Sequence, residues 1–260
     1  MPPRDSWQGT FVVATALCIV CSLLVSTAAV SLKSTQDRNK EIDKKKNVLL
    51  SAGLCEPGAT SAEVDQIFAE RIREELIDLD TGEVVTEERL AELGVDAKTY
   101  DARKAAKDPG MQEPISPDGA LPSIPYREPL ARVYQIVDGE ENQGYIFPVY
   151  AKGLWSTLYG FVAIDADCQT VKGITFYEHK ETPGLGGEVD NANWKATWPG
   201  KQVYDESGGV KLTVLKGKAG GDKYAVDGLS GATITTKGVN NLVKYWLGPT
   251  AYGQYLEKRS

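Results

Sequence analysis

The sequence has few residues suited to metal binding and no excess of basic charge. His179 is the only histidine among 260 residues, which excludes a His-rich metal site and chemistry that needs two imidazoles. The 29 basic and 36 acidic side chains give a net charge of −7. A nucleic-acid-binding protein needs a basic footprint, so this balance argues against that class.

Cysteine is also scarce, and the four cysteines form no framework. Cys18 and Cys21 lie in the most apolar stretch, where they are interpreted as small apolar residues of a lipid-facing helix; a redox or metal pair is the alternative. Cys55 and Cys168 are far apart in sequence, with no metal-ligand spacing around either. No metal site is predicted. A Cys55–Cys168 disulfide stays open if the domain is extracytoplasmic.

The N-terminus contains a long uncharged apolar run, FVVATALCIVCSLLVSTAAVSL, at residues 11–32. A membrane-spanning helix needs about 20 such residues, and the apolar region of a signal peptide has about 7–15. A retained transmembrane helix is therefore predicted after a short tail, residues 1–10. A cleaved signal peptide is the alternative, with Arg4 as its basic region and Thr27-Ala28-Ala29 as its cleavage site.

Charges beside this run bear on its orientation. Arg4 alone precedes it, whereas six basic residues follow it: Lys33, Arg38, Lys40, Lys44, Lys45 and Lys46. The positive-inside rule, taken simply, keeps the following domain in the cytoplasm, although long domains can translocate regardless of such charges.

Residues 33–107 are predicted to form a helical region. In SAEVDQIFAERIREEL, Ser61 is expected to cap a helix that has acidic residues in its first turns. Apolar residues recur there at three- and four-residue steps, which predicts one amphipathic helix; they are Val64, Ile67, Phe68, Ile72 and Leu76. TEERLAELG is expected to be a second helix with a glycine stop.

Prolines interrupt the chain from 108 to 129, which predicts an ordered or semi-extended connector. Residues 130–260 then change to a period of two. ARVYQIV, YIFPVYA, LYGFVAID and VKGITFYEH predict an antiparallel meander, and KLTVLKG and KYAVDG predict more strand. A last helix has an apolar stripe and ends near Gly248-Pro249. The fold class is α+β: a single N-terminal transmembrane helix, then an antiparallel sheet with flanking helices.

Two segments of this region are candidates for ligand binding. HKETPGLGGEV, residues 179–189, is neither a Walker A loop nor a Rossmann turn. It is a simple turn or a backbone that approaches a flat ligand closely. In KGLWSTLYGF, Trp155 is a core residue or a platform for an aromatic ring.

DGLSGATITT, residues 227–236, places four hydroxyl side chains just before and within the start of the last helix. A helix N-terminus carries free amides and partial positive charge, which suit a phosphate. Ordinary capping is the alternative.

Together, three strings resemble the covalent-FMN-binding domain family: Asp-x-x-Ser-Gly-Ala-Thr at 227–233, His-x-Glu-Thr-Pro-Gly-Leu-Gly at 179–186 and Gly-Leu-Trp-Ser at 153–156. With the N-terminal helix and the following STQDRNKEIDKKKNVLLSAGL, the whole chain is similar to the NqrC family, the C subunits of the sodium-translocating NADH:quinone oxidoreductases. The alternative is the related G subunit of the Rnf ion-translocating electron-transport complex.

The resemblance implies a cofactor, FMN, and its site. Thr233 would carry FMN as a phosphoester made by a separate flavin transferase. Ser230, Gly231 and Ala232 complete the attachment string, and Asp227 would help the transferase to position its metal and substrate. Two sets of residues would flank the flavin ring: Glu181, Thr182 and Leu185 on one side, and Leu154 and Trp155 on the other.

The resemblance also implies a function. The chain would be an electron carrier on the path from NADH to quinone, in a membrane complex of six subunits coupled to sodium translocation. It would not oxidise NADH alone, since nothing in it resembles an NADH site. Its domain would lie on the periplasmic side of the bacterial inner membrane, against the simple charge count. A membrane-anchored non-redox binding module and an independent flavin reductase remain the other function classes.

Overall fold

The computed structural model describes residues 6–115 and 124–260, which divide into two compact units. One unit ends at Asp43 and the other runs from Lys44 to Ser260. The first helix, α1 (Trp7–Ser51), contains the uncharged 11–32 run and continues beyond it without a break. It includes a window with a mean hydropathy of 2.4, and it is the one helix among the described residues that is long and apolar enough to cross a membrane.

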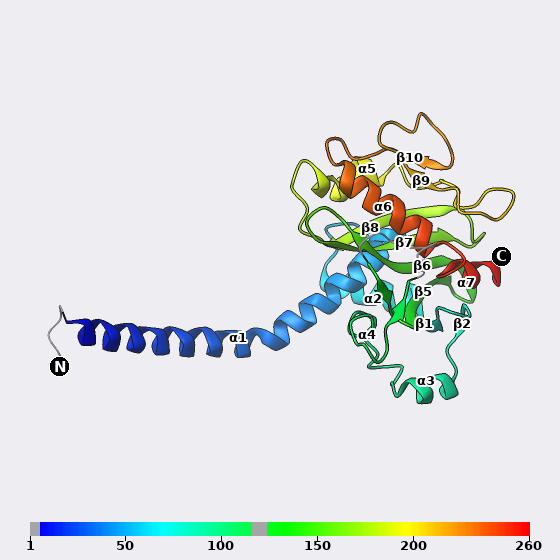
Figure 1. Cartoon of the computed structure of the whole chain (residues 1–260). Coiled ribbons are helices and arrows are strands. Elements are labelled where there is room, and N and C mark those ends of the chain that lie inside the picture. The colour runs from blue at the N-terminus through cyan, green and yellow to red at the C-terminus, as the bar shows by residue number, and fades with distance from the viewer. Residues whose placement is uncertain (1–5, 116–123) are drawn as a thin grey trace. The chain divides into compact units, whose positions relative to one another are not determined.

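A six-stranded antiparallel sheet in the order β2-β1-β5-β6-β7-β8 organises the second unit (Figure 1). The four predicted strands are β5 (Leu130–Asp138), β6 (Glu141–Lys152), β7 (Thr157–Asp165) and β8 (Val171–Glu178). Each pairs with the next along the chain, so the predicted meander is confirmed.

The predicted helix through Leu76 is wrong in its second half. Helix α2 (Ser61–Arg71) ends at Arg71, and β1 (Ile72–Asp78) follows directly. All seven residues of β1 pair with β5, and Ile72 already has extended backbone angles, φ −122° and ψ 126°. Pairing with β5 satisfies the backbone of this segment, so tertiary context overrides its helical period. The region predicted as helical therefore contributes an interior strand to the sheet.

Helix α2 has the kind of N-cap that the sequence predicts, but one residue earlier in the chain. Thr60, and not Ser61, is the N-cap of α2, and it forms a capping box with Glu63. The second predicted helix is α3 (Glu87–Leu93), and Gly94 ends it in the left-handed conformation at φ 64°. Glycine is favoured there because the left-handed region penalises a Cβ.

Short elements complete the second unit. They are β2 (Glu83–Val84), α4 (Ala102–Ala105), β3 (Glu113–Pro114), β4 (Tyr126–Arg127), the 3₁₀ helix η2 (Gly186–Asp190), α5 (Ala192–Lys195), β9 (Thr213–Val214), β10 (Ala225–Val226), α6 (Thr233–Trp246) and α7 (Gly253–Glu257). Strands β3 and β4 lie within the Pro-rich 108–129 segment and pair with each other; residues 116–123 of that segment lie outside the described residues. The KLTVLKG and KYAVDG segments supply β9 and β10, a parallel pair.

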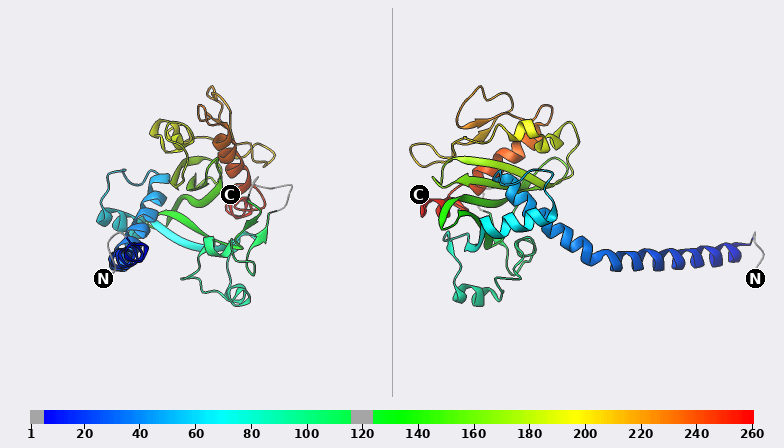
Figure 2. Two further views of the ribbon diagram at one scale, coloured as in Figure 1. Left: turned by 60° about the vertical axis from the view of Figure 1, so that its left-hand side comes forward. Right: turned by 180° about the vertical axis from the view of Figure 1, so that it is seen from behind.

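The main core lies between the sheet and α6. Figure 2 shows α6 on one side of the sheet and α2 on the other. The predicted apolar stripe of α6 is buried, and Trp246 Nε1 donates to the backbone oxygen of Tyr150 on β6 at 2.8 Å. A Cβ at Gly238 would lie 2.4 Å from the backbone oxygen of Lys152. Glycine therefore lets α6 approach β6 closely, next to the β6–β7 hairpin.

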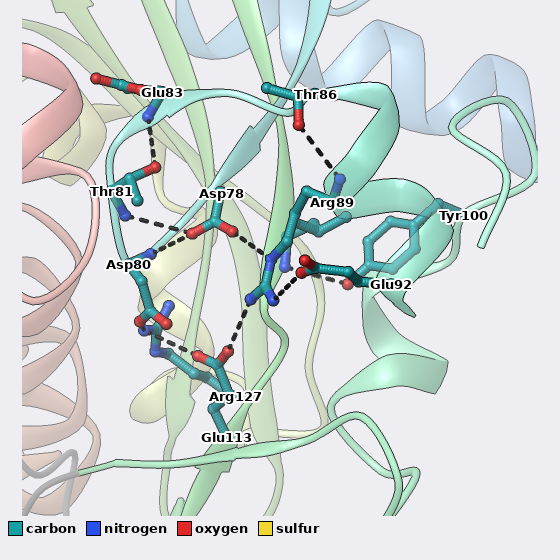
Figure 3. Close-up of polar contacts among 11 residues, drawn as sticks. Asp78, Asp80, Thr81, Glu83, Thr86, Arg89, Glu92, Tyr100, Glu113 and Arg127 are labelled. Carbon is teal, nitrogen blue, oxygen red and sulfur yellow. Dashed lines mark hydrogen bonds and ion pairs between the residues drawn. The ribbon is translucent and has the colours of Figure 1, made fainter. Parts of the chain in front are cut away.

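A polar network joins the β1–β2 turn to α3 and to the segment before β5 (Figure 3). The buried Asp78 carboxylate accepts from the backbone amide of Asp80 at 2.9 Å and from Arg89 Nε at 2.8 Å. Arg127 is buried and pairs with Asp80 and Glu113. A buried charge persists when it is paired and hydrogen-bonded. The network fixes the chain where it enters β5.

All four cysteines are free, and the Cys55–Cys168 disulfide that the sequence left open is absent from the structure.

Candidate functional site

Three segments converge at the start of α6. They are the β6–β7 hairpin at 153–156, the segment that follows β8 at 179–186, and the loop at 227–232 that leads into α6. The hairpin is tight, because the Gly153 amide donates to the Ser156 carbonyl at 2.8 Å. The structure thus brings the three candidate strings of the sequence together.

Glu181 joins these segments. Its buried carboxylate accepts from the amides of the hairpin residues Leu154 at 3.2 Å, Trp155 at 2.9 Å and Ser156 at 3.2 Å. It also accepts from the hydroxyl of Thr235, in the first turn of α6, at 2.6 Å. The carboxylate of Glu181 thus holds the hairpin and α6 together. Its position beside a flavin ring stays a prediction.

Two glycines make room for this carboxylate. A Cβ at Gly153 would lie 2.6 Å from Glu181 Oε1. A Cβ at Gly186 would lie 2.6 Å from both Glu181 Oε2 and Thr235 Oγ1. Gly153 and Gly186 are therefore needed for close packing around Glu181.

Hydrogen bonding keeps Glu181 ionised. Burial alone would raise the pKa of the carboxyl, but the bonds from the Thr235 hydroxyl and from the three hairpin amides outweigh burial and lower it below its usual value. A carboxylate that accepts several amide bonds is stabilised in its charged form.

His179 supports the same segment. Its Nδ1 accepts from the Glu181 amide at 3.2 Å, so its Nε2 carries the proton that is donated to Asp190 at 2.8 Å. The ring fixes the backbone of Glu181 relative to η2. The single histidine of the chain is therefore a structural support of the site.

The hydroxyls of the attachment string differ in their surroundings. Thr235 and Thr236 are buried: Thr235 donates to Glu181, and the Thr236 hydroxyl accepts from the Leu229 amide at 3.1 Å. Ser230 and Thr233 are exposed, and their hydroxyls make no hydrogen bond within the described part of the chain. Thr233 is the first residue of α6, and the N-cap, Ala232, provides no side-chain bond. A free hydroxyl thus stands at a helix N-terminus without a side-chain cap.

Exposed apolar side chains surround this helix start. Leu154 is 46% exposed, Trp155 67% and Leu185 44%, and Ile234, directly after Thr233, is 56% exposed. The sequence reasoning missed Ile234, although it is an apolar residue that lies off the buried stripe of its helix. Exposed apolar clusters on a soluble domain mark binding surfaces.

Leu185 also contacts the loop at 227–232 that leads into α6. Gly231 is in the left-handed region at φ 70°, and a Cβ there would lie 2.9 Å from Leu185 Cδ2. Thr182 is exposed, and its carbonyl accepts from the amides of Leu185 and Gly187 at 3.1 and 2.9 Å. This turn holds Leu185 against the loop that precedes Thr233.

Asp227 faces a different loop. Its carboxylate accepts from the amide of Ala219 at 2.6 Å and from Lys218 Nζ at 2.9 Å. The Ala219 bond, and then Lys218, lower the pKa of this carboxyl. The Asp227 carbonyl accepts from Trp194 Nε1 at 2.8 Å. The side chain of Asp227 thus stabilises the loop before the string rather than contacting Ser230 or Thr233 through a hydrogen bond.

The arrangement fits a phosphate-bearing aromatic cofactor. Helix α6 offers amides and partial positive charge for a phosphate, and a free hydroxyl lies at the same point. The exposed side chains of Leu154, Trp155, Leu185 and Ile234 offer apolar contact for a flat ring.

The sequence model of the FMN-binding domain family matches residues 153–248, which include all three converging segments. The domain is therefore of the FMN-binding class. The chain is 42% identical over 257 residues to the C subunit of the Na(+)-translocating NADH-quinone reductase of Yersinia pestis, with 98% of this chain and 94% of the relative covered. It belongs to that family of C subunits, the NqrC family.

Further relatives indicate the same family. The corresponding C subunit of Pseudomonas aeruginosa is 42% identical over 260 residues, covering 98% of this chain and 97% of its own. Among solved structures, Shewanella oneidensis NqrC is similar with a TM-score of 0.74 and 34% identity, covering 85% of this chain and 98% of that chain.

Proposed function

We propose that this chain is an electron-carrying subunit of a membrane NADH:quinone oxidoreductase complex, with FMN attached through its phosphate to Thr233. Electron transfer through that complex, from NADH to quinone, is coupled to sodium translocation. The full-length similarity to NqrC relatives supports this function over that of the Rnf G subunit, the alternative raised by the sequence.

The free Thr233 hydroxyl carries the proposal of covalent attachment. Thr235 and Thr236 are buried and hydrogen-bonded, so a transferase cannot reach them without opening α6. Ser230 is exposed as well but precedes the helix, whereas Thr233 is its first residue. At that position the helix amides stabilise the phosphate that the ester retains.

The flavin supplies the redox chemistry when bound, and this chain supplies its surroundings. Leu154, Trp155, Leu185 and Ile234 provide apolar contact for the ring. Thr182 shapes the turn that presents Leu185. Ser230, Gly231 and Ala232 direct the chain into α6 beside the phosphate.

Maturation requires a partner, a flavin transferase. Asp227 is proposed to help that enzyme position its metal and substrate. Because Lys218 is 90% exposed where it pairs with Asp227, it can be displaced to free the carboxylate at little cost.

Helix α1 is proposed as a single membrane anchor in a bacterial inner membrane, with the domain on the periplasmic side. The other members of a complex of six subunits would then be its permanent partners. The basic residues after the span argue for the opposite orientation, but a long domain is exempt from that rule.

Peptide mapping by mass spectrometry tests the attachment. The FMN mass is expected on the fragment that contains Thr233. Thr233→Ala should abolish it, while Ser230→Ala, the matched exposed control, should retain it. Recovery of the mass from the Thr233→Ala protein would show that another hydroxyl is the acceptor.

Loss of attachment must be distinguished from loss of folding. Thr233 is exposed and is not the N-cap of α6, so Thr233→Ala should change the free energy of unfolding by less than about 0.5 kcal/mol and should still unfold cooperatively. Steady NADH oxidation by the isolated chain would instead favour an independent flavin reductase.

A further inference from the structure

A cavity of about 370 Å³ lies apart from the attachment string, since no residue of 227–236 is in its lining. It is bounded by α4 and the residues just after it, by the 124–128 segment, and by the ends of β6, β7 and β8. An apolar cavity of about 150 Å³ is enough for benzene. This space is therefore large enough for one substituted aromatic ring.

Tyrosine rings form much of the wall. The rings of Tyr150 and Tyr159 lie 5.7 Å apart on neighbouring strands, and Tyr177 follows on β8. Arg103 covers one face of the Tyr159 ring, so the remaining faces and edges of these rings are available for edge or offset contact with another ring.

A buried acid lies in the same cavity. Glu128 is 4% exposed, and its Oε2 accepts from the Tyr150 hydroxyl at 2.6 Å. Burial raises the pKa of Glu128 to about 7, so a large share of the group is protonated at neutral pH. Its neutral form can donate a hydrogen bond to a ligand acceptor.

Two basic residues, Arg103 and Lys107, line the α4 side of the cavity. The Arg103 guanidinium lies 3.6 Å from the centre of the Tyr159 ring and pairs with Glu178 at 2.7 Å. Lys107 is exposed and makes no ion pair within the described ranges. Glu178 offsets the charge of Arg103, so Lys107 is the cationic lining residue that would repel a cationic ligand and attract an anionic group.

We propose that this cavity binds a single-ring aromatic carboxylate that carries a carbonyl opposite its carboxylate. The ring lies among Tyr150, Tyr159 and Tyr177, the carboxylate lies toward Lys107 and Arg103, and the carbonyl accepts from Glu128. The cavity lining shares no residue with the proposed flavin site. It is nevertheless connected to the flavin site, because the cavity residue Thr157 directly follows the 154–156 hairpin held by Glu181.

Binding of such a ligand depends on pH through Glu128. The other titratable groups that face it are Tyr100, Glu113, Arg127, Tyr150, Tyr245 and Tyr252. The ionised carboxylate repels the ligand and lacks the proton to donate. Affinity should therefore fall as the pH rises through about 7.

The test uses the full-length protein in nanodiscs, with 4-acetylbenzoate as the probe. Saturation-transfer NMR and equilibrium dialysis measure its binding. A probe of this size is expected to bind with a dissociation constant on the order of 1 mM at pH 6. The cationic analogue 4-acetylbenzylamine should bind more weakly. Absence of saturable binding at pH 6, or tighter binding of the amine, would overturn the proposal.

Variants locate the site. Ala106→Trp fills the cavity from its α4 side and should abolish binding, whereas Lys104→Trp, which lies on α4 but outside the cavity lining, should not. Glu128→Gln keeps the shape and a donor, so it should retain binding and lose the pH dependence. Lys107→Ala should weaken binding about two- to fivefold. Unchanged binding in Ala106→Trp, or an unchanged pH profile in Glu128→Gln, would reject this location.

Discussion

Glu181→Gln changes one buried acceptor group and keeps the side chain's shape. The wild-type carboxylate receives Leu154 and Thr235 on Oε2, and Trp155 and Ser156 on Oε1. Glutamine has one acceptor oxygen and one NH₂ group. Its best orientation directs the oxygen at Trp155 and Ser156 and the NH₂ at Thr235, whose hydroxyl can turn to accept.

The amide of Leu154 then has no acceptor. A buried donor left unsatisfied destabilises by about 1–3 kcal/mol, and bonds to a charged group are stronger than neutral ones. The hairpin lies at the surface, where water replaces part of the loss. Glu181→Gln is therefore expected to lower the free energy of unfolding by about 2 kcal/mol. Glu181→Ala removes all four bonds and should lower it by about 3 kcal/mol or more.

Hydrogen exchange separates this effect from general destabilisation. In the full-length protein, the amides of residues 154–156 should lose protection in both variants, and more in Glu181→Ala. Chemical unfolding gives the free energies. Glu140→Gln, an exposed acid, is the control and should change stability by less than about 0.5 kcal/mol.

Two results would refute the reasoning. One is unchanged protection of the 154–156 amides in Glu181→Ala. The other is a loss of stability in Glu181→Gln no larger than that in Glu140→Gln. Either would show that the carboxylate does not hold the hairpin in solution.

Three further predictions concern the pH dependence of stability, the surroundings of the flavin and the topology. Because the folded pKa of Glu181 is lowered, the stabilisation by its carboxylate is complete above the unfolded pKa of about 4.3 and is lost as the pH falls through the folded pKa. The difference in unfolding free energy between the wild type and Glu181→Gln should therefore shrink below about pH 4. A difference that grows below this pH would contradict the sign. Trp155→Ala and Leu185→Ala should leave FMN attached but alter its spectrum, potential or electron-transfer rate; unchanged potential and kinetics in both would place the ring elsewhere. A reporter fused after Ser260 should be active only if it functions outside the cytoplasm, and activity of a cytoplasm-only reporter would reverse the proposed topology.

Much of the fold could be predicted because its local signals agree with its tertiary structure. The meander strands have a period of two and turns between them, and each pairs with its sequence neighbour. The stripe of α6 is buried as its spacing indicates. Residues 72–78 were predicted wrongly because their apolar spacing also fits a helix. They form a strand because they pair with β5, which is distant in sequence. Pairing across about sixty residues leaves no local signal.

The site was predictable in its membership but not in the task of each residue. The three strings meet in the structure. Thr233 stays the predicted attachment residue, because Ser230 is exposed as well. The role of Glu181 could not be read from its string, because its partners lie on the hairpin and on α6. Asp227 belongs to the attachment string, yet its carboxylate is bound by Lys218 and Ala219. Hydrogen-bond partners are fixed by the fold.

In the proposed site, attachment of the phosphate and contact with the ring fall to different parts of the chain. As proposed, the start of α6 would provide the hydroxyl and the amides for the phosphate end, while Trp155 and Leu185 lie on loops outside α6. Glu181 links these parts through Thr235, two residues after Thr233. A change at Glu181 therefore moves the hairpin relative to the helix without removing the attachment hydroxyl. The expected signature is altered flavin properties with retained FMN mass, the reverse of what Thr233→Ala should give.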